Sequence, residues 1–196
     1  FVECERLPGN VDDLVLFSLG LVKAVDCLHC QAGIVHCDIK PDNVRWSGGD
    51  VVKLIDFGSA QLLSGEMSVH RGTEGYEAPE LFRKEGTVFN SPLTDTFSVG
   101  MCILKMIESM TSPHAKGESI TEELKKVAHH LACRDPFIRW PLKQAKQYLL
   151  NISSRSAQAS SPPKKLLKVE KPDVTQMMAR SISRDTACTP MLAPSS

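Results

Sequence analysis

A predicted β-hairpin at residues 43–55 constrains the fold of this chain more than any other feature. Residues 43–46 and 51–55 are short β-type runs, and the segment between them reads Ser-Gly-Gly-Asp, a turn sequence. The two strands of a hairpin lie side by side. We therefore expect Asn43, where the hairpin begins, and Asp56, which directly follows it, to belong to one site.

Helical patterns surround the hairpin. Asp12 and Asp13 form an acidic N-terminal signal, and the apolar residues that follow have helical spacing as far as Leu28. The run 94–107 is apolar on nearly every side, which predicts a buried helix. Further helices are predicted over 122–131 and 141–150. The body of the chain is thus expected to be mainly helical with one small hairpin.

Composition divides the chain near residue 152. Residues 153–196 are rich in Ser, Pro, Lys and Ala and carry seven Lys or Arg against three Asp or Glu, a charge of +4. Such a segment buries too little apolar surface to offset its ordering entropy, so we predict a disordered tail after a folded body over 1–152. The net charge of the whole chain is zero, which argues against a general nucleic-acid or acidic-membrane binder.

Neither membrane spans nor disulfides are expected. The longest apolar stretches, 14–28 and 99–107, are interrupted by lysines. The seven cysteines follow no regular disulfide spacing, which favours reduced thiols inside the cell, in the cytoplasm or the nucleus. Cys27 and Cys30 form a C-x-x-C, which is read either as half of a zinc site or as two positions of an amphipathic helix.

Three motifs lie in order between His36 and Glu80. The first is His-Cys-Asp-Ile-Lys-Pro-Asp-Asn at 36–43, the second is Asp-Phe-Gly at 56–58, and the third is Gly-Thr-Glu-Gly-Tyr-Glu-Ala-Pro-Glu at 72–80. Their order, spacing and positions around the hairpin resemble the catalytic half of a protein kinase. The resemblance covers about residues 1–150 and implies a protein-kinase-like α+β fold, represented by the mainly helical C-lobe.

The resemblance implies roles in transfer of the ATP γ-phosphate with Mg²⁺. Asp38 would orient the attacking hydroxyl and accept its proton, and Lys40 would neutralise the γ-phosphate. Asn43 and Asp56 would hold Mg²⁺, and Gly58 would let the backbone turn after the metal ligand.

The same resemblance implies a protein substrate with a Ser or Thr acceptor. Lys40 together with Thr73 and Tyr76 is similar to the serine/threonine branch of the family. Thr73 would bond toward Asp38 and Lys40, and Tyr76 would shape the floor on which the peptide docks. His36 is expected to pack under the loop without transferring protons.

Supporting positions match the family at greater distance. Asp95, at the start of the predicted buried helix, would accept hydrogen bonds from the catalytic-loop backbone. Arg139 would form a buried bridge with Glu80 of Ala-Pro-Glu. Phe97 stands where the family has Trp, which keeps an aromatic ring but loses the indole N–H.

Several parts of the family pattern are missing. There is no G-x-G-x-x-G loop and no strand lysine before the catalytic loop, so the N-lobe is absent from this chain. The first residues are similar to the hinge between lobes, where Glu3 and Glu5 would meet adenine. We expect the chain alone to be nearly inactive. The segment between Glu80 and Arg139 also looks shorter than the corresponding segment of the family.

Two alternatives remain open at this stage. A non-catalytic kinase-like scaffold, or pseudokinase, is compatible with the missing lobe, although Asp38, Lys40, Asn43 and Asp56 are all retained. A small-molecule phosphotransferase of related fold would share the acidic and amide residues. The 72–80 segment weighs against it, because that segment forms a peptide-docking platform in the kinases.

Cys37 stands where many kinases have an arginine that binds a phosphate on the activation loop. The main electrostatic contact to such a phosphate is therefore missing. We predict that Ser68→Glu in a complete protein leaves kinase activity within a few-fold of the unmodified level. Peptide phosphorylation rates measure this, with Ser68→Ala as the control. An increase by orders of magnitude on Ser68→Glu would show that phosphate does act as the switch.

Overall fold

The computed structural model describes residues 8–65, 68–69, 71–82, 90–110 and 118–160 of the chain. The predicted hinge residues Glu3 and Glu5 lie outside this set, as do residues 161–196 of the predicted tail.

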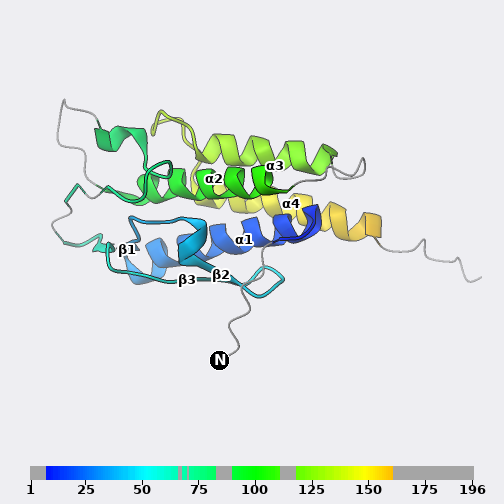
Figure 1. Cartoon of the computed structure of the whole chain (residues 1–196), viewed down its shortest axis with the longest axis horizontal. Helices are drawn as coiled ribbons and strands as arrows, with labels where there is room; N and C mark the ends of the chain where they lie inside the picture. The colour runs from blue at the N-terminus through cyan, green and yellow to red at the C-terminus, as the bar shows by residue number, and fades with distance from the viewer. Residues whose placement is uncertain (1–7, 66–67, 70, 83–89, 111–117, 161–196) are drawn as a thin grey trace, which may run out of the picture. The chain divides into compact units, whose positions relative to one another are not determined.

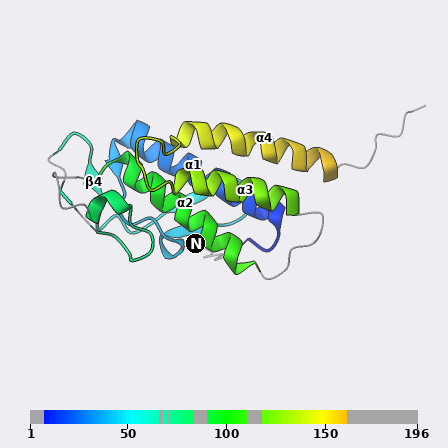
Figure 2. The ribbon, with the colours of Figure 1, turned by 90° about the horizontal axis from the view of Figure 1, so that it is seen from above.

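Four helices form most of the described body. They are α1 (Val11–Cys27), α2 (Pro92–Ser109), α3 (Glu118–Leu131) and α4 (Leu142–Ser160). Two views show them running side by side (Figures 1 and 2). α2 packs mainly on α3, and α1 packs mainly on α4. Their inward faces form one apolar core, which includes Leu14, Leu21, Ile103, Leu124 and Leu149. The mainly helical body predicted from the sequence is confirmed.

The start of α1 follows its sequence signal. Asn10 is the N-cap, and its side chain accepts a hydrogen bond of 2.8 Å from the backbone N–H of Asp13. After Cys27 the helix widens into a π-helical turn, Leu28–Ala32, which ends at Gly33 with a φ of 64°. The chain then reverses toward the hairpin, because a left-handed residue terminates the helical hydrogen bonding.

The predicted hairpin is present. β2 (Val44–Trp46) pairs antiparallel with β3 (Val52–Leu54), with Val44 opposite Leu54. A second antiparallel pair, β1 (Ile34–Val35) with β4 (Gln61–Leu62), was not predicted. Strands of two residues are too short to give an alternating pattern, so the sequence carries no signal for them.

The hairpin lies against α1 at a point where no side chain fits. A Cβ added to Gly20 would lie 2.8 Å from the carbonyl oxygen of Asp50 and 2.9 Å from Cγ2 of Val52. Beside this contact, the rings of Phe17 and Trp46 meet edge to face with centroids 6.0 Å apart. The position of the hairpin on α1 is thus fixed by backbone packing as well as by aromatic packing.

Every residue from Thr94 to Gly100, in the first half of α2, is buried. Ser91 and Thr94 form a capping box at its N-terminus, and Pro92 occupies the first turn. Between Glu80 and Arg139 the described residues form the 3₁₀ turn Pro79–Phe82 and the helices α2 and α3.

The boundary predicted near residue 152 is too early. α4 continues to Ser160, and both Ile152 and Ser156 are buried. The side chain of Ser156 donates a hydrogen bond to Asp12 in the first turn of α1. The folded body therefore extends beyond residue 152, because α4 continues to Ser160 and the Ser156 side chain still contacts α1.

Within the described residues, no helix combines the length and the apolar character that crossing a membrane requires.

Gly100 sets the closest approach of α2 to α3. A Cβ at this position would lie 2.5 Å from the backbone nitrogen of Ala132 and 2.7 Å from the carbonyl oxygen of Ala128. We predict that Gly100→Ala destabilises the chain by about 1–3 kcal/mol, because backbone atoms cannot yield to the added methyl group. Thermal unfolding measures the effect. Gly9→Ala is the control, because nothing lies within 4 Å of a Cβ there, and equal midpoints for the two variants would contradict the close contact.

Candidate active site

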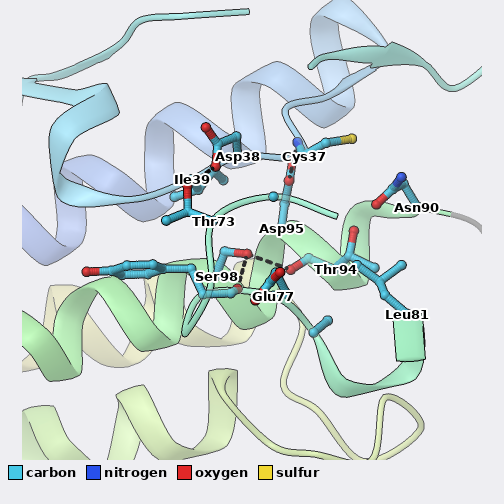
Figure 3. A pocket seen from close by; sticks show the side chains of 13 residues that line it. Cys37, Asp38, Ile39, Thr73, Glu77, Leu81, Asn90, Thr94, Asp95 and Ser98 are labelled. Carbon is cyan, nitrogen blue, oxygen red and sulfur yellow. Dashed lines mark hydrogen bonds between the residues drawn. The ribbon is translucent and has the colours of Figure 1, made fainter. Parts of the chain in front are cut away.

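The catalytic loop, residues 36–43, is held in place by Asp95 from the first turn of α2. The backbone N–H of His36 donates to Oδ2 of Asp95 at 2.7 Å, and that of Cys37 donates to Oδ1 at 2.9 Å. Figure 3 shows the Asp95 side chain directed from α2 toward Cys37. The contact expected of Asp95 from the family pattern is therefore present, on a carboxylate that is 1% exposed.

His29 is a third partner of Asp95 that sequence reasoning missed. Its Nε2 lies 2.8 Å from Oδ2 of Asp95, and both side chains are buried. His29 follows α1 within the π-helical turn, inside the C-x-x-C of Cys27 and Cys30 but outside the three motifs between His36 and Glu80. Its only signal is the Leu-His pair at the end of a predicted helix, which an amphipathic pattern explains equally well.

The backbone at Cys37 is strained. Its φ is 66°, in the left-handed region that residues with a side chain seldom adopt. Burial, followed by the nearby carboxylates of Asp95 and Asp38, raises the pKa of the Cys37 thiol to about 12. The side chain that replaces the family's arginine is therefore neutral at physiological pH, and its backbone depends on Asp95 to hold this conformation.

Asp38 lies at the centre of a hydrogen-bonded cluster. Its Oδ1 accepts from the Thr73 hydroxyl at 2.7 Å, and its Oδ2 accepts from Nζ of Lys40 and Nδ2 of Asn43, each at 3.0 Å. Lys40 also donates to the Thr73 hydroxyl at 2.7 Å. In Figure 3 Thr73 lies directly beside Asp38. The structure thus brings Thr73 of the 72–80 segment to Asp38, Lys40 and Asn43 of the 36–43 motif.

These contacts set the charge of Asp38. Burial on its own would raise the pKa of this carboxyl group, but the hydrogen bonds from Thr73, Lys40 and Asn43 and the charge of Lys40 outweigh it. The pKa of Asp38 therefore lies below its ordinary value. The group is a carboxylate at neutral pH, with donors on both oxygens.

Asn43 precedes the first strand of the hairpin and Asp56 follows the second, so both lie at its open end, as expected. The backbone N–H of Ile55 donates to the Asn43 carbonyl at 3.0 Å, which places Asp56 one residue beyond the last pairing. Asp56 is exposed and has a φ of 60°, while the N–H of Gly58 donates to its Oδ1 at 3.3 Å. The left-handed conformation is therefore at Asp56 itself, and Gly58 supplies a donor to the same carboxylate.

The pair fits a Mg²⁺ ion. Nδ2 of Asn43 is bound to the carbonyl and the carboxylate of Asp38, which leaves the amide oxygen as the free end of this buried side chain. Asp56 offers an exposed carboxylate. Mg²⁺ prefers such oxygen ligands and is commonly held by one or two carboxylates together with substrate phosphates. No cluster of three or more His, Cys, Asp and Glu residues that could hold a metal by itself occurs in the described ranges.

His36 has the structural role expected of it. The side chain is fully buried, its Nδ1 accepts from the N–H of Asp38 at 3.4 Å, and its Nε2 lies 3.1 Å from the carbonyl oxygen of Ile55. A proton on Nε2 satisfies both contacts. The ring of Phe57 lies over it, with centroids 4.9 Å apart. His36 thereby joins the catalytic loop to the segment that carries Asp56.

The 72–80 segment is anchored at both ends. A Cβ on Gly72 would lie 2.6 Å from the carbonyl oxygen of Cys37, so only glycine lets the segment approach the loop this closely. The carbonyl of Tyr76 accepts from the Ser98 hydroxyl at 2.7 Å. Tyr76 is half-buried, and burial raises the pKa of its hydroxyl. At the far end, Glu80 lies in the 3₁₀ turn and is buried.

Glu80 and Arg139 form the buried bridge expected from the sequence. Both guanidinium nitrogens donate to the two carboxylate oxygens, at 2.6 and 2.8 Å. Arg139 also donates to the carbonyls of Cys133 and Leu93 and lies over the ring of Phe97, 5.2 Å from its centroid. Every charged atom of the pair therefore has partners, which buried ions require.

Asn90 is a second residue that the sequence did not reveal. It is 1% exposed, and its Nδ2 donates to the carbonyl of Ser68 at 2.7 Å. Gln61 accepts from the N–H of the same Ser68 at 2.9 Å. Ser68 is thus held through its backbone by two neutral amide side chains, and nothing in the motif pattern indicates either contact.

The Asp38 cluster generates a prediction about protonation. Because Thr73 makes the strongest of the hydrogen bonds that lower the pKa of Asp38, Thr73→Val should raise that pKa toward its ordinary value. An NMR titration of the Asp38 carboxyl carbon measures the change. Thr96→Val is the control, because the Thr96 hydroxyl bonds within α2 to the Pro92 carbonyl. An unchanged pKa in Thr73→Val would show that Thr73 does not stabilise the carboxylate.

The comparisons with known proteins agree with this arrangement. The pattern of the protein kinase domain matches residues 10–173. A leaf rust 10 disease-resistance locus receptor-like protein kinase-like 2.3 from Arabidopsis thaliana is 42% identical over 111 residues, which are 53% of this chain and 18% of that protein. Serine/threonine-protein kinase MRCK beta from Homo sapiens is 34% identical over 133 residues, 64% of this chain and 7% of that protein.

A G-type lectin S-receptor-like serine/threonine-protein kinase SD2-5 from Arabidopsis thaliana is 41% identical over 96 residues, 46% of this chain. The chain spans less than a fifth of the length of each of these relatives. The family match covers most of the chain and includes the catalytic loop, the hairpin and the Glu80–Arg139 bridge. The chain belongs to the protein kinase domain family.

Proposed function

We propose that this chain is the catalytic-loop part of a serine/threonine protein kinase that transfers the ATP γ-phosphate to protein hydroxyls. The observation that carries the proposal is the set of three hydrogen bonds on Asp38 from Thr73, Lys40 and Asn43. Carboxyl groups whose pKa is shifted by specific partners are concentrated at functional sites, which supports a chemical role for Asp38.

Asp38 acts on the acceptor hydroxyl. Because its pKa is lowered, Asp38 remains an anion at neutral pH and accepts a hydrogen bond from a Ser or Thr O–H. This contact orients the hydroxyl oxygen for in-line attack and receives its proton as the new bond to phosphorus forms. Phosphoryl transfer depends mainly on such positioning and on charge neutralisation.

The residues around Asp38 complete the site. Lys40 brings a cation to the place where the transferred phosphoryl group would lie, and it is fixed there by Asp38 and Thr73. The amide oxygen of Asn43 and the carboxylate of Asp56 would hold Mg²⁺. Magnesium-bound ATP supplies the phosphoryl group. Asn43 keeps its amide oriented by donating to the Asp38 carbonyl at 2.8 Å.

Ser or Thr specificity is proposed from the link between the catalytic loop and the 72–80 segment. Lys40 contacts Thr73, so the cation and the peptide-docking segment are positioned together. The relatives named as serine/threonine-protein kinases support this assignment. Tyr76, fixed through its carbonyl to Ser98, would form the floor under the substrate peptide.

We further propose that the activation segment does not depend on a phosphate. The Cys37 thiol is neutral and cannot bind one, and the backbone of Ser68 is already held by Gln61 and Asn90. Ser68 is exposed whereas the Cys37 side chain is buried, so this thiol presents no charged group to a phosphate on Ser68.

The remaining assignments are extensions of the same proposal. Glu3 and Glu5 would bind adenine through their backbone groups. The protein would act in the cytoplasm, where ATP is available and where free thiols such as those of the described cysteines persist. Nucleic acid and membrane surfaces are not proposed as partners. A non-catalytic scaffold is the alternative function.

Substitution of Asp38 tests the proposal. In the full-length protein that contains this chain, Asp38→Asn should lower kcat for peptide phosphorylation by about 10²–10⁴-fold, because the acceptor hydroxyl loses its anionic partner. The rate is measured with ATP, Mg²⁺ and a Ser/Thr peptide. Asp50→Asn is the matched control, since this half-buried residue lies on the hairpin turn, where its carboxylate pairs with Lys23 of α1 at the end of the hairpin opposite the proposed site.

Three outcomes separate the possibilities. A loss in Asp38→Asn alone supports the kinase function. No activity in the unmodified full-length protein, with ATP binding absent by fluorescent-nucleotide titration, favours the scaffold. Preference for aminoglycoside- or choline-like acceptors over peptides would assign the protein to small-molecule phosphotransferases instead.

A further inference from the structure

Two thiols at the end of α1 take no part in the proposed phosphoryl transfer. Cys27 is the last residue of α1, Cys30 lies in the π-helical turn Leu28–Ala32, and both are free and exposed. Cys37 and Cys102 are buried, and burial raises the pKa of each of these thiols to about 12. Of these four thiols, an oxidant in the solvent therefore reaches the exposed pair first, because reactivity requires access and a thiolate.

The spacing places the two thiols on one face. Residues three apart on a helix have Cα atoms about 5 Å apart, which lies inside the range of roughly 4.4–6.8 Å seen in disulfides. The Cys27 thiol donates forward to Oε1 of Gln31 at 3.3 Å, and the Cys30 thiol donates backward to Oδ1 of Asp26 at 3.7 Å. The Cys27 side chain thus points toward the C-terminal end of the turn, and the Cys30 side chain points back toward α1.

A bond between them requires a local movement. Cβ atoms three apart on a regular helix are about 5–6 Å apart, whereas a disulfide needs roughly 3.5–4.5 Å. The turn must therefore tighten. It is already irregular, because it is π-helical and is followed by the left-handed Gly33. A strained disulfide is easily reduced again, which is the property of a reversible bond.

His29 lies between the two cysteines in the same turn. Its side chain is 7% exposed, and its Nε2 lies 2.8 Å from Oδ2 of Asp95, the oxygen that also accepts from the N–H of His36. Tightening the turn from Cys27 to Cys30 moves the backbone that carries His29. The cysteines are therefore connected to the catalytic loop through a single side chain.

We infer that Cys27 and Cys30 form a reversible redox site, in which a disulfide withdraws His29 from Asp95 and loosens the catalytic loop. The regulatory consequence rests on the proposed kinase function, whereas the bond itself does not. Among the residues that the structure describes, no group of three or more His, Cys, Asp and Glu residues suited to a metal includes the pair.

The oxidant is a hydroperoxide. The thiolate of one cysteine attacks the O–O bond and becomes a sulfenic acid, and the departing oxygen leaves as water or an alcohol after taking up a proton. The second cysteine then attacks the sulfenic sulfur, the S–S bond forms and a water molecule leaves. Two electrons pass from the two sulfurs to the peroxide. Two equivalents of a thiol such as glutathione restore both cysteines.

The first test detects the bond in the full chain. After treatment with hydrogen peroxide, free thiols are alkylated, the chain is digested, and peptides are read by tandem mass spectrometry. We expect Cys27 and Cys30 in one peptide that has lost two hydrogens and carries the alkyl label on Cys37 alone. Dithiothreitol should reverse the change. Cys30→Ser should abolish it, whereas Cys133→Ser should not. Alkylation of both Cys27 and Cys30, or bonds from either to another cysteine, would overturn the proposal.

The second test follows the loop by amide hydrogen exchange. In the oxidised chain the N–H groups of His36 and Cys37 should exchange about tenfold faster, because Asp95 loses one of its partners. His29→Ala should give the same increase in the reduced chain. Peroxide-treated Cys30→Ser should show none. Formation of the disulfide with unchanged exchange at both amides would refute the coupling to the loop. Neither measurement requires phosphoryl transfer, so their failure is distinct from failure of the proposed function.

Discussion

The buried carboxylate of Asp95 is the interaction on which the catalytic loop depends. It accepts from the backbone of His36 and Cys37 and is paired with His29, so a charge that would be costly in the interior has partners on both oxygens. Its place in the first turn of α2 adds the favourable end of the helix dipole. The strained backbone at Cys37 persists because these bonds hold it.

The chemistry of the site depends on the hydrogen bonds and charges around Asp38. Asp38 is kept anionic by donors from the catalytic loop itself and from the 72–80 segment, so the same contacts set its charge and join the two segments. The Glu80–Arg139 bridge fixes the far end of that segment against the loop before α4. The residues proposed to bind the acceptor peptide and Mg²⁺ thus lie together at a loop that is anchored from three directions.

Much of this arrangement is predictable because it is local or carried by motifs. The hairpin follows from β-type runs around Gly-Gly, and the Asp38 cluster follows from residues that the kinase resemblance places together. The contacts of His29 and Asn90 could not be predicted, since each joins elements distant in sequence through one side chain of ordinary type. The end of the body was predicted too early because composition averaged over 153–196 hides the last turns of α4, where Ser156 still meets Asp12.

The contact of Gly20 with the turn of the hairpin has a consequence for how tolerant this site is to change. Because Asp50 and Val52 pack directly against the backbone of Gly20, the hairpin cannot shift along α1 or lengthen its turn without losing this contact. Asn43 and Asp56, at the opposite end of the same two strands, inherit that register. The spacing of the oxygens proposed to bind the metal therefore depends on a glycine of α1 beside the hairpin turn, where substitution would alter cation affinity without touching the cation.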